Sequence, residues 1–433
     1  MEIYWGKLVD VEVLTCIWTK AAVMCPVVAI WESVVDGRVE RNDRLGDSVM
    51  KLFTERGVEP YTLDSFFTIF FFLMMQLLFL VILFGGGAFS LTAQQQPITI
   101  KHSPTAVLIE NVGGQNVVNF DFLIENTSQD TLELSSVKIS LFDAKRALLQ
   151  ERFLDNNGTA PSIKTIPNRV WNGKSKELVF NPFPAYSASL QVRTMAFEFT
   201  FGDNNDKEYT VKYEVTPARY EQKVQLILPL QERLLVYDAH DFNAHHRRFN
   251  YEFVPIKQLG FSGNFMRYAY DFVVVNDGGL QKKNDGKENT DWFGFGAPVL
   301  AVAAGKVVVA EGSHLDDKKF NIPALKTNPL ALYGNCVVIE HSAGVYSVYG
   351  HLKQNSISVK VGDVVKQAQT IGAIGTSGSS FFPHLHFEMR NAITHNAEGI
   401  PSYFSNFSFL RGAEKQVVKY GTVDSGDIVK SGK

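Results

Sequence analysis

The stretch Pro383-His384-Leu385-His386-Phe387-Glu388-Met389-Arg390 alternates between apolar and polar residues, which is typical of a β-strand. Side chains two positions apart on a strand point to the same face, so His384 and His386 are expected to stand side by side. A pair of this kind is either part of a metal site or two structural histidines, and the spacing alone does not choose between them. The rest of the sequence therefore has to supply the remaining ligands.

The composition is that of an ordinary globular protein. The chain has 433 residues, of which 45% are hydrophobic and 20% charged, with a formal net charge of −3. This length allows two or three domains, and the small net charge indicates neither a nucleic-acid partner nor a membrane-surface partner. Cys336 is the only cysteine beyond the first 25 residues and lies in an apolar run, so we interpret it as core packing.

Residues 66–93 are almost continuously apolar. Roughly 20 apolar residues suffice to span a bilayer, so the segment is either a signal peptide or a membrane anchor, with a buried core helix as a third reading. Leu91-Thr92-Ala93 resembles a small-residue cleavage site before a polar start at Gln94, which favours export. Membrane contact is then expected only through this segment if it is uncleaved. Residues 1–65 are an uncertain N-terminal extension, and we exclude them from the fold.

Residues 94–220 show short alternating runs separated by polar turns. This spacing predicts an immunoglobulin-like antiparallel β-sandwich, whose work is binding or spacing. The runs are 117–124, 137–142 and 196–201, with turns at 156–158 and 202–205.

Residues 221–412 also read as mostly β. An apolar strand is expected at 222–230, and the polar segments 276–291 and 314–328 read as loops that form the walls of a groove. Residues 413–433 are predicted to be a flexible tail. Further strands are expected at 298–303, 306–310, 335–340 and 344–349.

Several spaced motifs within about 226–390 agree in order with those of one family. The sequence resembles the LytM/lysostaphin-type zinc metallopeptidases, whose fold is a compact antiparallel β-sheet domain. The motifs are Gly296-Ala297-Pro298-Val299, Ala303-Ala304-Gly305-Lys306-Val307, Tyr333-Gly334-Asn335, Tyr349-Gly350-His351-Leu352, Val361-Gly362-Asp363-Val364-Val365, Ile371-Gly372 through Ser377-Gly378, and Pro383 through Glu388.

The resemblance implies a zinc-dependent hydrolase of peptide bonds in bacterial peptidoglycan. Asp271 matches the family's ligand aspartate, and His386 matches a ligand histidine. His351 and His384 match the two catalytic histidines that do not bind the metal. One imidazole can then accept a proton while the other stabilises the oxyanion.

One position departs from the family pattern. The first zinc ligand is normally a histidine four residues before the aspartate, and Arg267 occupies that place. A guanidinium has no lone pair to donate to zinc. Either another residue substitutes, or the chain is a degenerate relative that regulates a cell-wall amidase or binds the wall.

A histidine-rich stretch upstream offers the missing ligand. Three histidines fall within residues 240–246. If this stretch is extended, His246 lies on the more apolar face, so we predict that it supplies the third ligand. His245 is the second choice, and Asn264 is a distant third because an amide oxygen suits zinc poorly. The alternative is that the stretch is a polar wall of the substrate groove.

Overall fold

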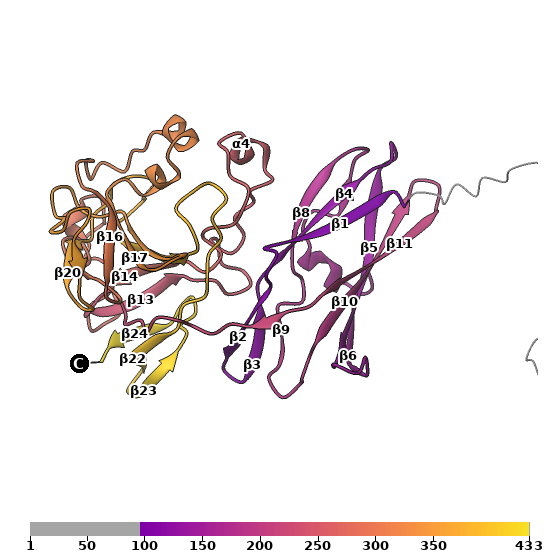
Figure 1. The fold of residues 1–433 in the computed structure, drawn as a ribbon, viewed down its shortest axis with the longest axis horizontal. Helices are drawn as coiled ribbons and strands as arrows, with labels where there is room; N and C mark the ends of the chain where they lie inside the picture. The colour runs from indigo at the N-terminus through magenta and orange to yellow at the C-terminus, as the bar shows by residue number, and fades with distance from the viewer. Residues whose placement is uncertain (1–95, 433) are drawn as a thin grey trace, which may run out of the picture. The chain divides into compact units, whose positions relative to one another are not determined.

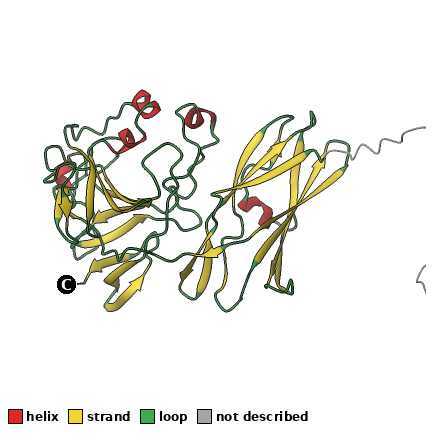
Figure 2. Cartoon of the chain, viewed as in Figure 1, coloured by secondary structure: helices red, strands yellow, loops and turns green. Residues whose placement is uncertain are grey.

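Strands dominate the computed structural model, which describes residues 96–432. Figure 2 shows that helices are confined to single short turns. The mostly-β class predicted from the sequence is therefore confirmed. Residues 94–433 group as one compact unit. The helical turns in the described part are η1 (Ser162–Thr165), α4 (Val254–Lys257), η2 (Asn289–Asp291), η3 (Ile322–Lys326) and η4 (Pro329–Tyr333).

Residues 96–220, here called the N-terminal module, form three small sheets around their own core (Figure 1). All pairings are antiparallel except β12 with β2. The immunoglobulin-like arrangement stays a prediction. The sheets are β1 (Ile98–Ser103), β4 (Asp121–Asn126) and β8 (Lys176–Phe180); β11 (Glu208–Val215), β10 (Thr194–Asp203), β5 (Leu132–Phe142) and β6 (Leu148–Leu154), with β7 (Val170–Trp171) on β5; and β12 (Ala218–Arg219), β2 (Leu108–Val112), β3 (Gln115–Val118) and β9 (Ala185–Ser187).

The core of the N-terminal module follows the alternation of its strands. On β10, Met195, Phe197, Phe199 and Phe201 are all fully buried, while the residues between them are partly exposed. Phe197 meets Phe122 of β4 edge to face, with ring centroids 4.8 Å apart. Edge-to-face aromatic pairs of this kind add to the stabilisation from apolar burial.

Residues 221–432, here called the sheet domain, are built on one ten-stranded sheet (Figure 1). The strands of this sheet pair antiparallel, and a two-stranded sheet of β15 (Pro298–Leu300) and β20 (Thr370–Ala373) accompanies it. Its order is β19 (Val364–Val365), β16 (Gly305–Glu311), β17 (Cys336–Ser342), β18 (Val345–Gly350), β21 (Leu385–Arg390), β14 (Tyr270–Val274), β13 (Arg233–Asp238), β24 (Ile428–Ser431), β22 (Phe404–Arg411) and β23 (Glu414–Gly421).

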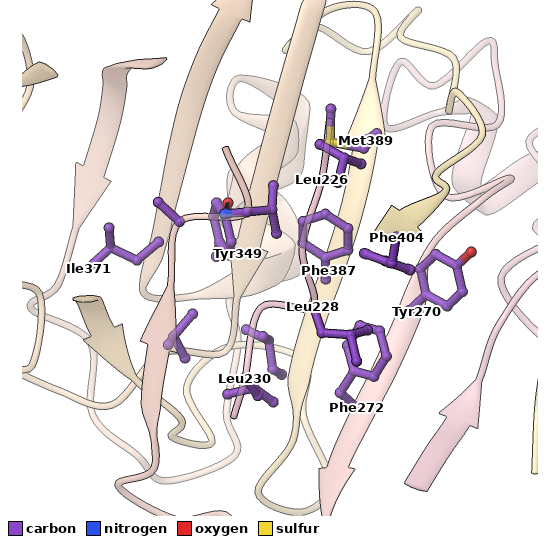
Figure 3. Packing of buried hydrophobic residues seen from close by; sticks show 14 of the residues in the cluster. Leu226, Leu228, Leu230, Tyr270, Phe272, Tyr349, Ile371, Phe387, Met389 and Phe404 are labelled. Atoms are coloured by element: carbon purple, nitrogen blue, oxygen red, sulfur yellow. Dashed lines mark hydrogen bonds between the residues drawn. The ribbon is translucent and has the colours of Figure 1, made fainter. Parts of the chain in front are cut away.

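The strand expected at 222–230 is absent, and this prediction was wrong. Apart from a single bridge between Leu226 and Phe404, the segment has no ladder partner. Its leucines Leu226, Leu228 and Leu230 are nevertheless buried against Phe272 and other aromatic residues of the sheet (Figure 3). Alternating apolar residues indicate that one face of a segment is buried. Here the segment packs that face against the sheet and does not pair with it as a strand.

The flexible tail expected at 413–433 is also wrong for residues 414–431. β23 pairs with β22, and β24 lies between β22 and β13 inside the large sheet. Val429 is fully buried there. This segment is polar because β23 has an exposed face. The composition of that face gives no information about which strand β23 pairs with.

The apolar segment 66–93 and the extension 1–65 lie outside the described residues. Between residues 96 and 432, no helix has the length and apolarity needed to cross a membrane. Cys336 is buried on β17 and has no disulfide partner in that range, as expected for a core residue. Burial raises the pKa of its thiol to about 12, so it stays protonated at neutral pH.

Two buried ion pairs connect the N-terminal module to the sheet domain. Glu110 Oε1 on β2 lies 3.2 Å from His240 Nε2, and both side chains are almost fully buried. Asp121 Oδ2 on β4 lies 2.8 Å from the guanidinium of Arg267, again with both groups buried. An unpaired buried charge is strongly destabilising, so each partner depends on the other.

The His240 pair predicts a stability that depends on pH. Burial opposes the charged imidazole, but the carboxylates of Glu110, Asp424 and Asp241 outweigh it and raise the pKa of His240 above 6.5. The rings of Tyr268 and Tyr270 also face His240. A raised folded-state pKa contributes stability that is complete below pH 6.5 and is lost as the pH rises through the folded-state pKa, which lies above 6.5.

We therefore expect the free energy of unfolding of the parent to fall, relative to a His240→Asn variant, as the pH increases. The change amounts to about 1.4 kcal/mol for each unit by which the folded pKa exceeds that of the unfolded chain. Urea titrations of both proteins between about pH 6 and pH 9 measure it. Curves that stay parallel over this range would contradict the assignment.

Candidate metal centre

The centre of the ten-stranded sheet brings together two of the predicted ligands. Asp271 on β14 and His386 on β21 are directly opposite each other in the antiparallel register. His386 Nδ1 lies 3.1 Å from Asp271 Oδ1. The strand register fixes this pair, because residues facing each other across an antiparallel ladder have their side chains on the same face.

His246 joins this pair from outside the sheet. Its Nε2 lies 3.7 Å from Asp271 Oδ1, and its ring centroid is 4.8 Å from that of His386. One donor atom from each of His246, Asp271 and His386 lies within 4.8 Å of the others. The three residues predicted as ligands therefore converge on one point.

The local structure that delivers His246 differs from the one assumed in the sequence analysis. Residues 241–249 are a series of turns, so the expectation of an extended stretch was wrong. The turns nevertheless bury Ala244 and His246, whereas the His245 side chain is 81% exposed. The predicted preference for His246 over His245 agrees with this burial.

Asp238, at the end of β13, orients His246. Its Oδ2 lies 2.9 Å from His246 Nδ1 and also accepts a hydrogen bond from the His246 backbone N–H, at 3.1 Å. A carboxylate that accepts the Nδ1 proton leaves the Nε2 lone pair free for a metal, as is common for metal-binding histidines. Asp238, His245 and His246 also form a looser group of donors, but His245 Nδ1 is 3.9 Å from Asp238.

The electrostatics of Asp271 match those of a metal ligand. Burial alone would raise its pKa, but the neighbouring imidazoles of His384 and His246, with a hydrogen bond from His386, hold that pKa well below 3.8. Asp271 is therefore a carboxylate at neutral pH, as a metal ligand has to be. Two imidazoles and one carboxylate form a donor set that zinc accepts in catalytic sites.

The two histidines predicted to be catalytic lie next to these donor atoms. His384 Nε2 lies 3.5 Å from Asp271 Oδ1, and the His351 and His384 ring centroids are 4.8 Å apart. His384 Nδ1 donates to the carbonyl of Phe382, and His351 Nδ1 donates to the carbonyl of Ser377, each at 2.8 Å. Because a carbonyl only accepts, both rings keep an unprotonated Nε2 in their neutral forms.

The backbone at His351 is held in an unusual conformation. Its φ is +59°, in the left-handed region, which costs of order 1–3 kcal/mol for a non-glycine residue when the surroundings impose it. The His351 N–H donates to the carbonyl of Tyr333, and its carbonyl accepts from the N–H of Gly375. Burial, with the nearby rings of His384 and His386, keeps the pKa of His351 well below 6.5, so the ring is neutral at pH 7.

A groove is lined by Gly334 and Gly378, each next in sequence to a residue that hydrogen-bonds to His351. Both glycines are at positive φ, and their backbones approach so closely that a Cβ on either would collide with the other. This contact explains the glycines in the two motifs and places the carbonyl of Ser377 beside His351. The loop predicted at 314–328 does form a wall of this groove, with lining residues Ser313, His314, Leu315, Asp317, Lys319, Phe320, Asn321, Ala324 and Ala331.

A buried polar cluster supports His386 from behind. Glu388 Oε2 lies 3.6 Å from His386 Nε2, and Glu388 Oε1 accepts a hydrogen bond of 2.8 Å from Tyr333. Arg390 pairs with Glu388 and donates to the Tyr333 hydroxyl at 2.7 Å. Glu388 therefore places a carboxylate beside the Nε2 of His386, while Nδ1 faces Asp271.

These supporting residues were not singled out in the sequence. Glu388 and Arg390 could have been predicted, because the alternation of the strand places them on the same face as His386. Asp238 and Tyr333 carried no signal of a role at the metal centre, since their positions depend on turns and on contacts between distant segments.

Arg267 and Asn264 each contact other groups near the candidate ligands. Arg267 is buried between Asp121 and Glu398, whose Oε2 is 3.2 Å from its Nε. Burial opposes its charge, but these two carboxylates raise the pKa of Arg267 well above its usual value. The Asn264 amide donates to the backbone carbonyls of His246 and Arg247, at 3.3 and 2.9 Å. Asn264 thus holds the ligand segment through its amide nitrogen.

Comparison with known proteins relates part of this domain to one family. Residues 288–401 match the family described as Peptidase family M23. This match agrees with the resemblance noted in the sequence.

The curated relatives include enzymes and an activator. Similarity is 37% identity over 95 residues to the peptidoglycan DD-endopeptidase ShyB of Vibrio cholerae, covering 22% of this chain and 18% of the relative. It is 35% over 95 residues to the murein hydrolase activator EnvC of Escherichia coli, with coverages of 22% and 18%. The solved catalytic domain of lysostaphin from Staphylococcus simulans is 29% identical, with 32% of this chain and 79% of that chain covered and a TM-score of 0.21. The matches thus span about a fifth of the length of these two curated relatives.

Proposed function

We propose that this protein is an exported zinc metalloendopeptidase that hydrolyses peptide bonds in bacterial peptidoglycan. The observation that carries the proposal is the convergence of donor atoms from His246, Asp271 and His386 within 4.8 Å of one another. His351 and His384 adjoin this set: His384 Nε2 lies 3.5 Å from Asp271 Oδ1, and the His351 ring centroid lies 6.0 Å from that of His386. Such a combination serves hydrolysis, whereas a purely structural domain has no physical need for it.

His246, Asp271 and His386 are the residues that would hold zinc. When bound, zinc supplies Lewis acidity, which polarises a carbonyl group and lowers the pKa of water. Asp238 holds His246 in the tautomer that leaves its Nε2 free, and Glu388 lies beside the Nε2 of His386.

His351 and His384 perform the proton transfer and charge stabilisation. Each ring is fixed at Nδ1 by a backbone carbonyl, so its Nε2 is the atom that accepts or returns a proton. The neutral His351 is suited to take a proton from the attacking water. The other imidazole, once protonated, donates a hydrogen bond to the oxyanion that develops on the substrate carbonyl.

The runner-up function is a regulator that activates a cell-wall amidase or binds the wall. The observation that favours it is Arg267 in the place of the usual first ligand, together with similarity to a relative named as a murein hydrolase activator. His246 counts against this reading, because it supplies the donor that Arg267 cannot.

The enzyme is expected to release soluble muropeptides from purified peptidoglycan sacculi. A chelator should stop the release, and added Zn²⁺ should restore it, because the ligands are not otherwise replaceable. Chromatography of the digest, with zinc content measured on the same sample, checks both points. Protein that contains zinc and releases nothing would instead support the regulator.

The remaining features follow from this substrate. Peptidoglycan lies outside the cytoplasm, so we propose that residues 66–93 direct export to the periplasm or cell envelope and that the mature chain begins near Gln94. The N-terminal module is proposed to be an immunoglobulin-like sandwich. N-terminal sequencing of the envelope protein tests the first point, and retention of the apolar segment would favour an anchor.

A further inference from the structure

We propose that the N-terminal module is a positioning part of the metal centre. Through Asp121 and Glu110 it holds the turn segment 240–249, which carries His246. The proposal rests on the proposed function, because it assumes that His246 binds zinc. It gives the module a role in metal binding, whereas the sequence predicted only binding or spacing for it.

The need for support arises from where the three ligands lie. Asp271 and His386 are held by the ladder between β14 and β21. His246 lies on turns, where few backbone groups are paired within the segment. A ligand on such a segment keeps its position only if other groups fix the backbone, because first-shell geometry has to be maintained to a fraction of an ångström.

The first line of contacts begins at Asp121 of the N-terminal module. Asp121 pairs with Arg267, and Arg267 Nε pairs with Glu398 Oε2. Glu398 Oε1 accepts from the backbone N–H of Asn264, at 3.2 Å. The amide of Asn264 then donates to the carbonyl of His246. Four consecutive contacts thus connect a carboxylate of the module to the backbone of the ligand.

A further contact fixes the same line from the module side. The amide of Asn119 donates to the backbone carbonyl of Arg267, at 3.1 Å, and both residues are buried. The module therefore contacts both the side chain and the backbone of Arg267. Arg267, at the position of the family's usual histidine, contributes to the site by holding the replacement ligand.

The second line begins at Glu110 and holds the start of the turn segment. Glu110 pairs with His240, whose ring packs between Tyr268 and Tyr270 with centroids 5.3 Å from each. The next residue, Asp241, accepts a hydrogen bond of 3.0 Å from the hydroxyl of Ser425. The segment is therefore held at its start by Glu110 and within its turns by Asn264.

The test uses the full chain with two nearly isosteric changes, Asp121→Asn and Glu110→Gln. Each removes a carboxylate of the module and touches no residue of the metal centre. The control Glu214→Gln removes a carboxylate from an exposed ion pair of the same module, with Arg146. His386→Ala provides the reference for a lost ligand. Zinc affinity is measured by competition with a chromophoric chelator, and the coordination by the absorption spectrum of the Co²⁺-substituted protein.

Both test variants should bind zinc at least about tenfold more weakly than the parent, as for the loss of an outer-shell partner. Their Co²⁺ spectra should change, and Glu214→Gln should match the parent in both measurements. Hydrogen exchange should accelerate in residues 240–249 while β14 and β21 stay protected.

Three results would overturn the proposal. Folded variants with the parent's zinc affinity would remove the module from the metal centre while leaving the proposed function intact. Loss of the strand signal in circular dichroism for both variants would show that the contacts hold the whole fold and not the ligand in particular. A parent protein that binds no zinc would overturn the proposed function together with this inference.

Discussion

A His246→Ala variant is expected to lose zinc as completely as His386→Ala. Both residues direct an imidazole nitrogen to the same point as Asp271, and a three-residue donor set that loses one member holds zinc poorly. The parent should retain about one zinc ion per chain after dialysis against a weak chelator, and the two variants almost none. Metal analysis of the dialysed proteins measures this, and peptidoglycan hydrolysis should disappear in parallel.

The matched control is His245→Ala, one position away. His245 is exposed and its Nδ1 is 3.9 Å from Asp238, so its loss should leave the zinc content unchanged. Equal zinc occupancy in His246→Ala and the parent would end the assignment of the third ligand. Loss of zinc in His245→Ala alone would instead assign that role to the neighbouring histidine.

The second large effect is expected at His351. Replacement by alanine should lower kcat for hydrolysis by about 10²–10⁴, the usual contribution of a positioned acid or base. The zinc content should stay at the parent value, because His351 Nδ1 is engaged with the Ser377 carbonyl and the ring does not belong to the donor set. Release of muropeptides and zinc content, measured on the same preparation, separate a lost base from a lost metal.

His102→Ala is the control for this substitution, since His102 lies in the N-terminal module and bonds to Tyr213. It should hydrolyse peptidoglycan at the parent rate. An active His351→Ala protein would show that the proton is taken by another group, with His384 as the first candidate.

The sequence was sufficient wherever a local pattern determines the structure. The alternation of residues 383–390 correctly predicted β21 and the shared face of His384 and His386. The phenylalanines of β10 likewise identified their own buried face. Period-two alternation reports burial directly, because only one face of such a strand meets the core.

The preference for His246 came from an incorrect local structure. An extended stretch was predicted, but residues 241–249 form turns. The apolar character of Ala244 beside His246 still indicated which side turns inward. Burial was thus readable from composition, whereas the backbone path depended on Asp238 and Asn264, which lie outside the stretch.

The pairing between distant segments could not be predicted from the sequence. Nothing in residues 414–431 indicates that β24 lies beside β13, and nothing near Arg267 indicates a partner at Asp121. Such contacts depend on the complementarity of two surfaces that a single sequence does not relate.

The position of β24 in the sheet has a consequence for the kinetics of folding. Arg233 of β13 pairs with Lys430 of β24, so this ladder closes a loop that contains nearly the whole sheet domain. Proteins dominated by non-local pairing fold slowly, because the entropy of loop closure is lost before the contact forms. Until β24 arrives, β13 presents an open edge beside β14, the strand of Asp271. Open strand edges invite pairing with other chains, so the interval before this last strand docks is the period in which the nascent domain is most prone to aggregate.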